Sequence, residues 1–172
     1  MTQDTAVDLV LRLETTLDHP VGKVWPYILH WNLWVDDKDF ISHRVAGKAD
    51  TEGEVKAVSH FDDTGRMDSH FFIQVLKIVP NNLLIYKILS PEHAYDAETG
   101  NATEVPQTGY EVFSIFEKGG NTLVVLDVLA ELRLAGTTAD QGRTIAEKYK
   151  VETEKNWYQK YFPKLRQLLS HQ

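Results

Sequence analysis

Histidine is the residue type here best suited to acid–base or metal chemistry, so its spacing comes first. The sequence holds His19, His30, His43, His60, His70, His93 and His171. No two of them form an H-x-x-x-H or H-E-x-x-H pair, which would place two ligands on one helix face. We therefore predict no metal site and no cofactor. His70 is the candidate general base, because strand alternation directs it toward an apolar face. A structural role in the core is the alternative for it.

Other absent patterns narrow the chemistry further. The chain contains no cysteine, which excludes disulfides, thiolate catalysis and iron–sulfur ligation. No G-x-S-x-G, Walker A or G-x-G-x-x-G motif occurs, so serine-hydrolase and nucleotide-binding functions lack support. A formal net charge of -7 disfavours nucleic acid as a partner. The chain shows neither a leader pattern nor about 20 consecutive apolar residues, so we expect a cytoplasmic protein without a membrane span.

The elements that would position these residues begin with a strand from Val7 to Leu17, where apolar and polar residues alternate. Asp18, His19 and Pro20 then indicate a helix start, because Asp caps free N–H groups and Pro suits an early helical position. A second short helix or turn is expected from His30 to Val35. Two short helices should therefore follow the first strand.

Alternation with period two then predicts six further strands. They span Phe40 to Gly47, Glu54 to Phe61, Asp68 to Val79, Leu83 to Leu89, Tyr110 to Glu117 and Thr122 to Leu134. Residues 90–107 read as a long loop, and a final helix should start at Thr138 or Asp140 and reach about Leu169. With 172 residues, of which 42% are hydrophobic, we expect one domain over 1–172 with its core at about 7–170.

This order of elements resembles the START/Bet v 1-like superfamily, also called the SRPBCC or helix-grip fold. Within it, the polyketide cyclase/dehydrase-like and AHSA1-like groups are the most similar. The residues that carry the resemblance are the segment from His19 to Trp25, Trp31 with Trp34, Gly53, Val75 with Pro80, and Gly120-Asn121-Thr122. The resemblance implies an α+β domain whose seven-stranded curved antiparallel sheet grips the long terminal helix, with a ligand cavity between them. It implies no catalytic residue, because the superfamily shares no catalytic motif.

Strand parity gives the candidate pocket residues. Lys77 should face water, which directs His70, Phe72 and Gln74 inward, and outward charges on a later strand direct Tyr110 and Ser114 inward. Four-residue steps along the final helix add Trp157 and Tyr161, and Asn156 joins them if the helix is straight. Pro163 supplies a cause for a bend. The predicted walls are Trp34, Phe72, Tyr86, Tyr110, Trp157 and Tyr161, and the predicted orienting groups are Gln74, Ser114 and Asn156.

We expect these residues to bind a small, largely apolar molecule that is lipid-like, aromatic or polyketide-like. An ordinary filled core is the alternative to a cavity. The first rival function is a cyclase, dehydratase or hydrolase with His70 as base and Tyr86 as acid partner. The second is an AHSA1-like interaction module that uses its outer surface. Titratable groups facing one another inside would favour the enzyme, and a filled cavity beside an exposed apolar patch would favour the module. The oligomeric state is left open.

Overall fold

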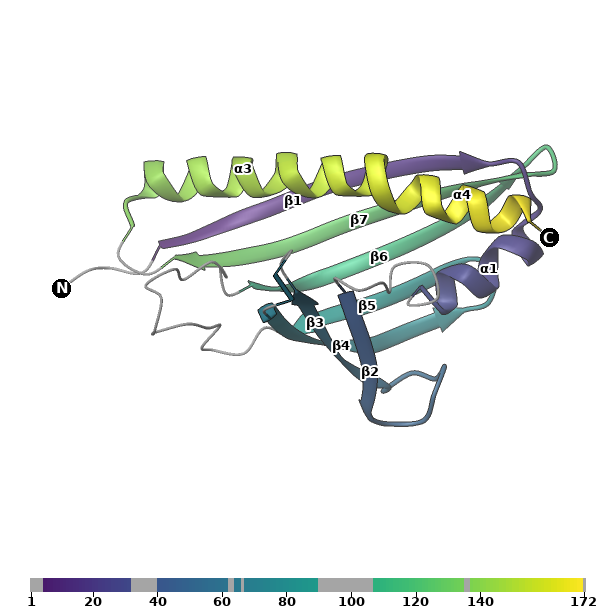
Figure 1. Cartoon of the computed structure of the whole chain (residues 1–172), viewed down its shortest axis with the longest axis horizontal. Coiled ribbons are helices and arrows are strands. Elements are labelled where there is room, and N and C mark those ends of the chain that lie inside the picture. The colour runs from purple at the N-terminus through teal and green to yellow at the C-terminus, as the bar shows by residue number, and fades with distance from the viewer. Residues whose placement is uncertain are drawn as a thin grey trace.

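The computed structural model describes residues 5–31, 40–61, 64–65, 67–89, 107–134 and 137–171. Its centre is one antiparallel sheet of seven strands in the order β1-β7-β6-β5-β4-β3-β2 (Figure 1). The strands are β1 (Thr5–Leu17), β2 (Phe40–Ala46), β3 (Val55–Phe61), β4 (Met67–Val79), β5 (Leu83–Leu89), β6 (Gln107–Lys118) and β7 (Asn121–Leu134). All seven predicted strands are thus confirmed, and the sheet begins and ends with β1 and β2 as its edges.

The helices cover one face of this sheet. Helix α1 (Val21–Leu29) starts at Pro20 without a side-chain cap, so the capping role expected of Asp18 is wrong. The C-terminal helix comprises α3 (Ala139–Asn156), the π-helical turn η1 (Trp157–Tyr161) and α4 (Phe162–Ser170). Thr138 caps it through a reciprocal capping box with Gln141, as one of the two predicted starts requires. The expected second short helix lies mostly outside the described residues. Among those described, no helix is long and apolar enough to cross a bilayer.

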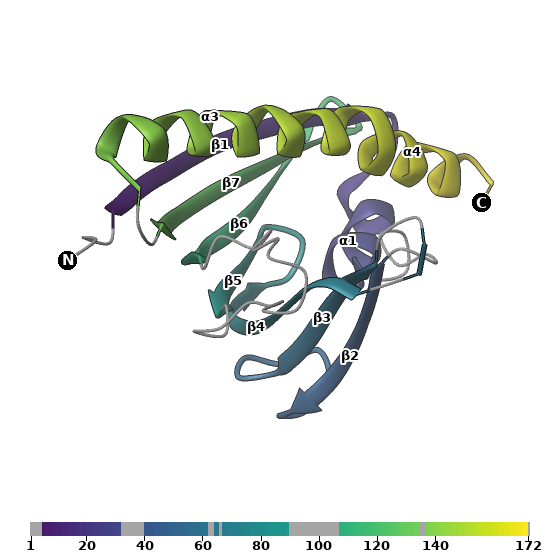
Figure 2. The ribbon, with the colours of Figure 1, turned by 60° about the vertical axis from the view of Figure 1, so that its left-hand side comes forward.

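The sheet curves, and its concave face holds the core. Figure 2 shows the C-terminal helix running along the β1 and β7 side, while β2 and β3 form the far edge. Leu11 and Leu13 of β1 and Val124 and Leu126 of β7 are buried in this core, as the alternation of apolar residues along both strands requires. Phe162, Leu165 and Leu169 of α4 pack into the same cluster.

A β-bulge reverses the predicted parity of most of β4. Val75 pairs with Tyr86 and Lys77 pairs with Ile85, so Leu76 is an extra residue on β4. Lys77 does face water, as predicted, but before the bulge the odd positions Ile73 and Val75 face the core. The inward placement of Phe72 and Gln74 is therefore wrong, because alternation does not continue through a bulge.

The parity predicted for β6 is also wrong. Phe113 and Ile115 are buried in the core, whereas Tyr110 is 43% exposed. Tyr110 and Ser114 consequently lie on the convex face. The prediction placed Glu111 in water because it is charged, but Glu111 shares its face with Phe113. One charged residue on the core side therefore led to the wrong inward face being predicted for the whole strand.

The π-helical turn keeps the apolar residues of the final helix, which recur in steps of four, on the side that faces the sheet. On a helix of 3.6 residues per turn, each step of four residues goes about 40° beyond a full turn. In η1 the Phe162 N–H donates to the Trp157 carbonyl, five residues back, and this wider turn restores the phase. Pro163 follows at once and has no N–H to donate. Asn156 is exposed, so its predicted turn toward the sheet is wrong, and Glu152 is exposed beside Lys148.

Candidate functional site

Polar side chains gather in one row across the concave face. Tyr86 pairs directly with Glu111, and Val75 pairs with Tyr86 on the other side. The Val75 N–H donates to the Glu54 carbonyl oxygen over 2.8 Å, which continues the row to the start of β3. On the β7 side, Glu111 pairs with Val128, which ends the row. Residues opposite one another in neighbouring strands share a face, so Glu54, Tyr86 and Glu111 all lie on the core side.

Tyr86 is the aromatic centre of this row. Its ring is nearly fully buried and meets the rings of Trp31 and Phe113 edge-on, with centroids 6.3 and 6.4 Å away. Burial raises the pKa of the Tyr86 hydroxyl strongly, the Trp31 indole partly opposes this, and the nearby carboxylates, Glu111 first among them, raise it further. The hydroxyl therefore stays protonated at all ordinary pH values and acts as a hydrogen-bond donor.

Glu111 is the titratable group of the row. Within the described part of the chain, its carboxyl group forms no hydrogen bond and no salt bridge. Burial raises the pKa of Glu111 to about 7, because the charged form loses hydration without gaining a partner. At neutral pH the carboxyl group is therefore present both as a proton donor and as a proton acceptor, one strand away from the Tyr86 hydroxyl.

A second polar group lies at the β3 end of the row. Lys56 is only 7% exposed, and its Nζ atom is 4.0 Å from Oε1 of Glu54, which is 3% exposed. The other oxygen of Glu54 accepts the Asp50 N–H over 2.8 Å, and Asp50 in turn lies 3.2 Å from Nδ1 of His30. Glu54 thereby ties the β2–β3 turn to the end of α1, close to Trp31.

Comparison with known proteins places this geometry. No protein-family model matches the chain, and no curated protein is similar to it in sequence. Solved structures do match. An uncharacterised protein from Rhizobium leguminosarum has 14% identity and a TM-score of 0.62 over 99% of this chain and 100% of its own. Ara h 8.0201 has 11% identity and a TM-score of 0.60 over 96% and 100% of the two chains.

DynU16, a protein in the dynemicin biosynthetic locus, has 15% identity and a TM-score of 0.56 over 94% of this chain and 47% of its own. The chain has the START/Bet v 1-like, helix-grip fold. The predicted fold class is thereby confirmed, and the resemblance stated from the sequence is confirmed for the fold. In this helix-grip domain the row of Glu54, Tyr86 and Glu111 lies on the sheet face that the terminal helix grips.

The helix-grip domain brings three of the predicted pocket residues to that face. Tyr86 lies in the polar row, and Trp157 lies on η1 with its ring 6.1 Å from that of Phe113 and 5.2 Å from that of Tyr161. Trp157 and Tyr161 both pack against the core cluster without being fully buried. These aromatic rings pack against the core cluster, and their role as pocket walls stays a prediction.

The other predicted residues lie elsewhere or are not described. Phe72, Gln74, Tyr110 and Ser114 are on the convex face, and Asn156 is exposed on the helix. Trp34 lies outside the described residues. The His70 side chain also lies outside them, and the parity argument that directed it inward fails at its neighbours Phe72 and Gln74.

Sequence reasoning missed Glu111, Glu54 and Lys56, because it assigned charged residues to water. One signal could have found Glu111. Phe113 and Ile115 together are more apolar than Tyr110 and Ser114, so the odd positions of β6 make the better core face. No comparable signal marks Lys56. Its position follows from the pairing of β3 with Ile73 of β4, which depends on the bulge at Leu76.

Proposed function

We propose that this protein binds a small, largely apolar ligand on the concave face of its sheet, with Glu111 and Tyr86 as the polar contacts. The observation that carries the proposal is the Glu111 carboxyl group, which is half-buried beside the core residue Phe113 and forms no hydrogen bond or ion pair with the described part of the chain. Such a carboxyl group is only partly hydrated, and a ligand hydrogen bond would replace the water that it still contacts. The surrounding aromatic rings of Tyr86, Phe113 and Trp157 suit an apolar or aromatic body.

The helix-grip fold supports the same proposal, since its resemblance implies a ligand cavity between sheet and helix. A few polar groups on an apolar surface are typical of small-molecule sites. The lipid-like, aromatic and polyketide-like classes all satisfy this description. An interaction module with a filled interior would have no use for an unpaired carboxyl group on its inner face.

The test uses N-phenyl-1-naphthylamine, a neutral apolar fluorophore, and two neighbouring positions on opposite faces of β6. Glu111→Trp places bulk in the proposed ligand space and should weaken probe binding by ~10-fold or more, whereas Tyr110→Trp places the same bulk on the convex face and should leave it unchanged. Urea unfolding checks that both variants fold. Equal affinity in the two variants, or no enhanced emission and no rise in Tm with the native sequence, would overturn the proposal.

Proton transfer on the bound ligand is the second candidate function, and the Tyr86–Glu111 pair favours it. The pair meets the criterion of facing titratable groups, although Glu111 takes the place predicted for His70. Ionised Glu111 would remove a proton α to a ligand carbonyl, and the Tyr86 hydroxyl would donate a hydrogen bond to the resulting enolate oxygen before the proton returns. Paired groups whose environments set different pKa values are typical of such chemistry.

Solvent deuterium exchange tests this second function with 2-acetonaphthone as the probe ketone. The native protein should accelerate exchange of the methyl protons at pH 7, and Glu111→Gln should lower that rate by ~10². An exchange rate equal to that in buffer would exclude proton transfer while leaving binding intact.

A further inference from the structure

The Lys56 side chain is nearly buried, and its ammonium group has only a long ion-pair contact. It is 7% exposed, and its one ion-pair contact among the described residues is the 4.0 Å approach to Glu54. That distance exceeds a charge-assisted hydrogen bond, which measures about 2.7–2.9 Å. Glu54 also accepts the Asp50 N–H, so its charge is shared. The Lys56 ammonium group therefore retains capacity for a closer anionic partner than Glu54.

A second cation adjoins Lys56. Arg44 of β2 pairs directly with Lys56 across the two strands. Like charges directly opposite one another destabilise a sheet, unless a negative charge lies between them. Arg44 is exposed at the edge of the sheet and donates to the Gly47 carbonyl oxygen over 2.8 Å, which leaves further guanidinium donors. Lys56 and Arg44 thus form a cationic pair that is buried at one end and open at the other.

We propose that the ligand is an amphipathic anion whose negatively charged oxygens bind Lys56, with Arg44 at the rim. This inference rests on the proposed binding function and specifies its ligand class. From Lys56 on β3 to Glu111 on β6 are three strand spacings, ~14 Å along the sheet. Ile73, Val75 and Tyr86 lie between these two ends and are all buried in the core cluster. The ligand therefore has an anionic end at β3 and a hydrogen-bonding group near Glu111, and its apolar body would take the place of side chains such as Trp31 that now cover Tyr86.

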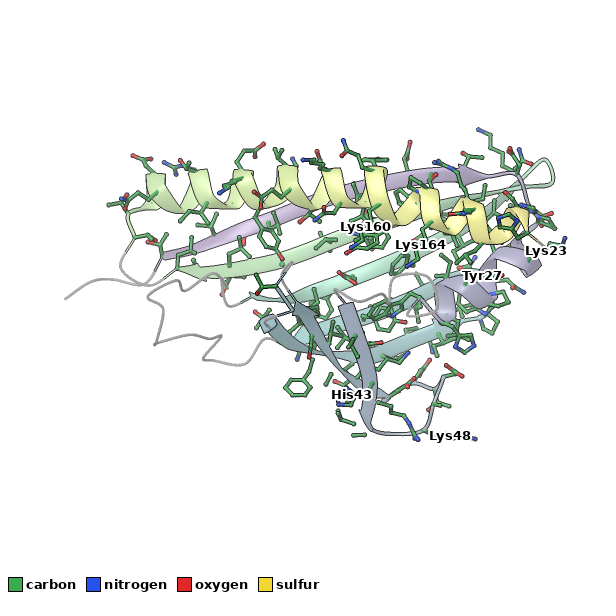
Figure 3. The ribbon with its side chains drawn as sticks, viewed as in Figure 1. Lys23, Tyr27, His43, Lys48, Lys160 and Lys164 are labelled. Carbon is green, nitrogen blue, oxygen red and sulfur yellow. The ribbon has the colours of Figure 1, made fainter. Side chains whose placement is uncertain are left out.

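The experiment compares two probes that share an anilinonaphthalene body. 1-Anilinonaphthalene-8-sulfonate carries a sulfonate, and N-phenyl-1-naphthylamine lacks it. The native protein should bind the sulfonate more tightly, and Lys56→Met should weaken sulfonate binding by ~10-fold or more while changing naphthylamine binding less than twofold. Lys23→Met removes an exposed lysine of α1, labelled in Figure 3, and should change neither affinity.

A second variant guards against misfolding of the first. Lys56→Met leaves Glu54 buried without its cation, so the double variant Lys56→Met with Glu54→Gln removes both charges. It should show the same loss of sulfonate affinity. If both probes bind the native protein equally and neither variant changes the sulfonate affinity, the anionic ligand class is excluded although the binding function stands. If neither probe binds, the binding function itself fails.

Discussion

Glu111 owes its position to backbone pairing rather than to any partner of its own side chain. Its neighbours Phe113 and Ile115 fill the core, and β6 pairs with β7 along its whole length and with β5 from Thr108 to Ser114, so the strand cannot rotate Glu111 into water. The cost of holding a carboxyl group there appears as a raised pKa. A residue kept at such a cost on an inner face is a candidate for function rather than for stability.

This cost predicts how stability depends on pH. Burial raises the pKa of Glu111 from 4.5 to about 7, so between these values the folded protein holds a proton that the unfolded chain releases. The free energy of unfolding should therefore fall as pH rises from about 5 to 8, by up to about 3 kcal/mol from this residue. Glu111→Gln should remove that contribution. The free energy of unfolding of the variant should therefore rise relative to that of the native protein as pH increases.

Urea unfolding at several pH values measures the effect. Glu117→Gln is the matched control, because Glu117 lies on the same strand but is exposed. Its unfolding curve should follow that of the native protein at every pH. Parallel behaviour of Glu111→Gln and the native protein from pH 5 to 8 would show that Glu111 is not the group that titrates.

Two irregularities, a β-bulge and a π-helical turn, determine which of the predicted side-chain orientations are correct. The existence of every strand followed from alternation, because that pattern is local and extends over several residues. The faces of β1 and β7 also followed, since neither strand has an irregularity in its pairing with the other. The bulge at Leu76 and the π-helical turn at Trp157 each add one residue to a regular repeat. Neither has a sequence signature of its own, so the face of β4 and the exposure of Asn156 could not be predicted.

The contact between α3 and β1 gives a prediction at the scale of elements. Gly142 of α3 is buried, and an added Cβ would lie 2.8 Å from a Val7 methyl group and 3.2 Å from a Thr5 methyl group. Gly142→Ala should gain up to ~1 kcal/mol of helix propensity but lose ~1–3 kcal/mol to overpacking, so a net loss is expected. Gly22 of α1 has open space around its Cβ direction. Gly22→Ala should therefore be stabilising by ~0.5–1 kcal/mol.

Urea unfolding of the two variants measures this contrast in sign. Adding Val7→Ala to Gly142→Ala should relieve the contact, so the double variant should be more stable than the sum of its single changes predicts. A stabilising Gly142→Ala would mean that the helix can move off β1 at little cost.

At the scale of the whole molecule, the two halves of the concave face differ in what covers them. Leu9, Ala130 and Ala146 form a cluster that joins α3 to β1 and β7, so this half is closed by the helix. Toward the other edge, Trp31 and the α1 residues Val24 and Ile28 pack in the core cluster that contains Tyr86. Lys56, Tyr86 and Glu111 lie on β3, β5 and β6, outside the part of the sheet that contacts α3. The order of elements in the sequence predicted the gripping helix, but only strand pairing shows which strands lie beyond its contact.

Hydrogen exchange can locate ligand binding within this asymmetric molecule. Amide exchange slows where a segment is packed or held by a ligand, and local opening is easiest at exposed edges. Without ligand, we expect β1 and β7 to exchange slowly and β2 to exchange fastest, because β2 is an exposed edge strand. Addition of N-phenyl-1-naphthylamine should slow exchange chiefly in β3, β4 and β5, whose inner side chains lie between Lys56 and Glu111. Since β1 and β7 are already covered by α3, they should change little.

The Glu111→Trp variant, whose affinity for the probe is expected to be lower, should show little protection at the same probe concentration. Protection confined to β1 and α3 would instead place the ligand under the helix, and the polar row from Glu54 to Glu111 would then have no role in binding it.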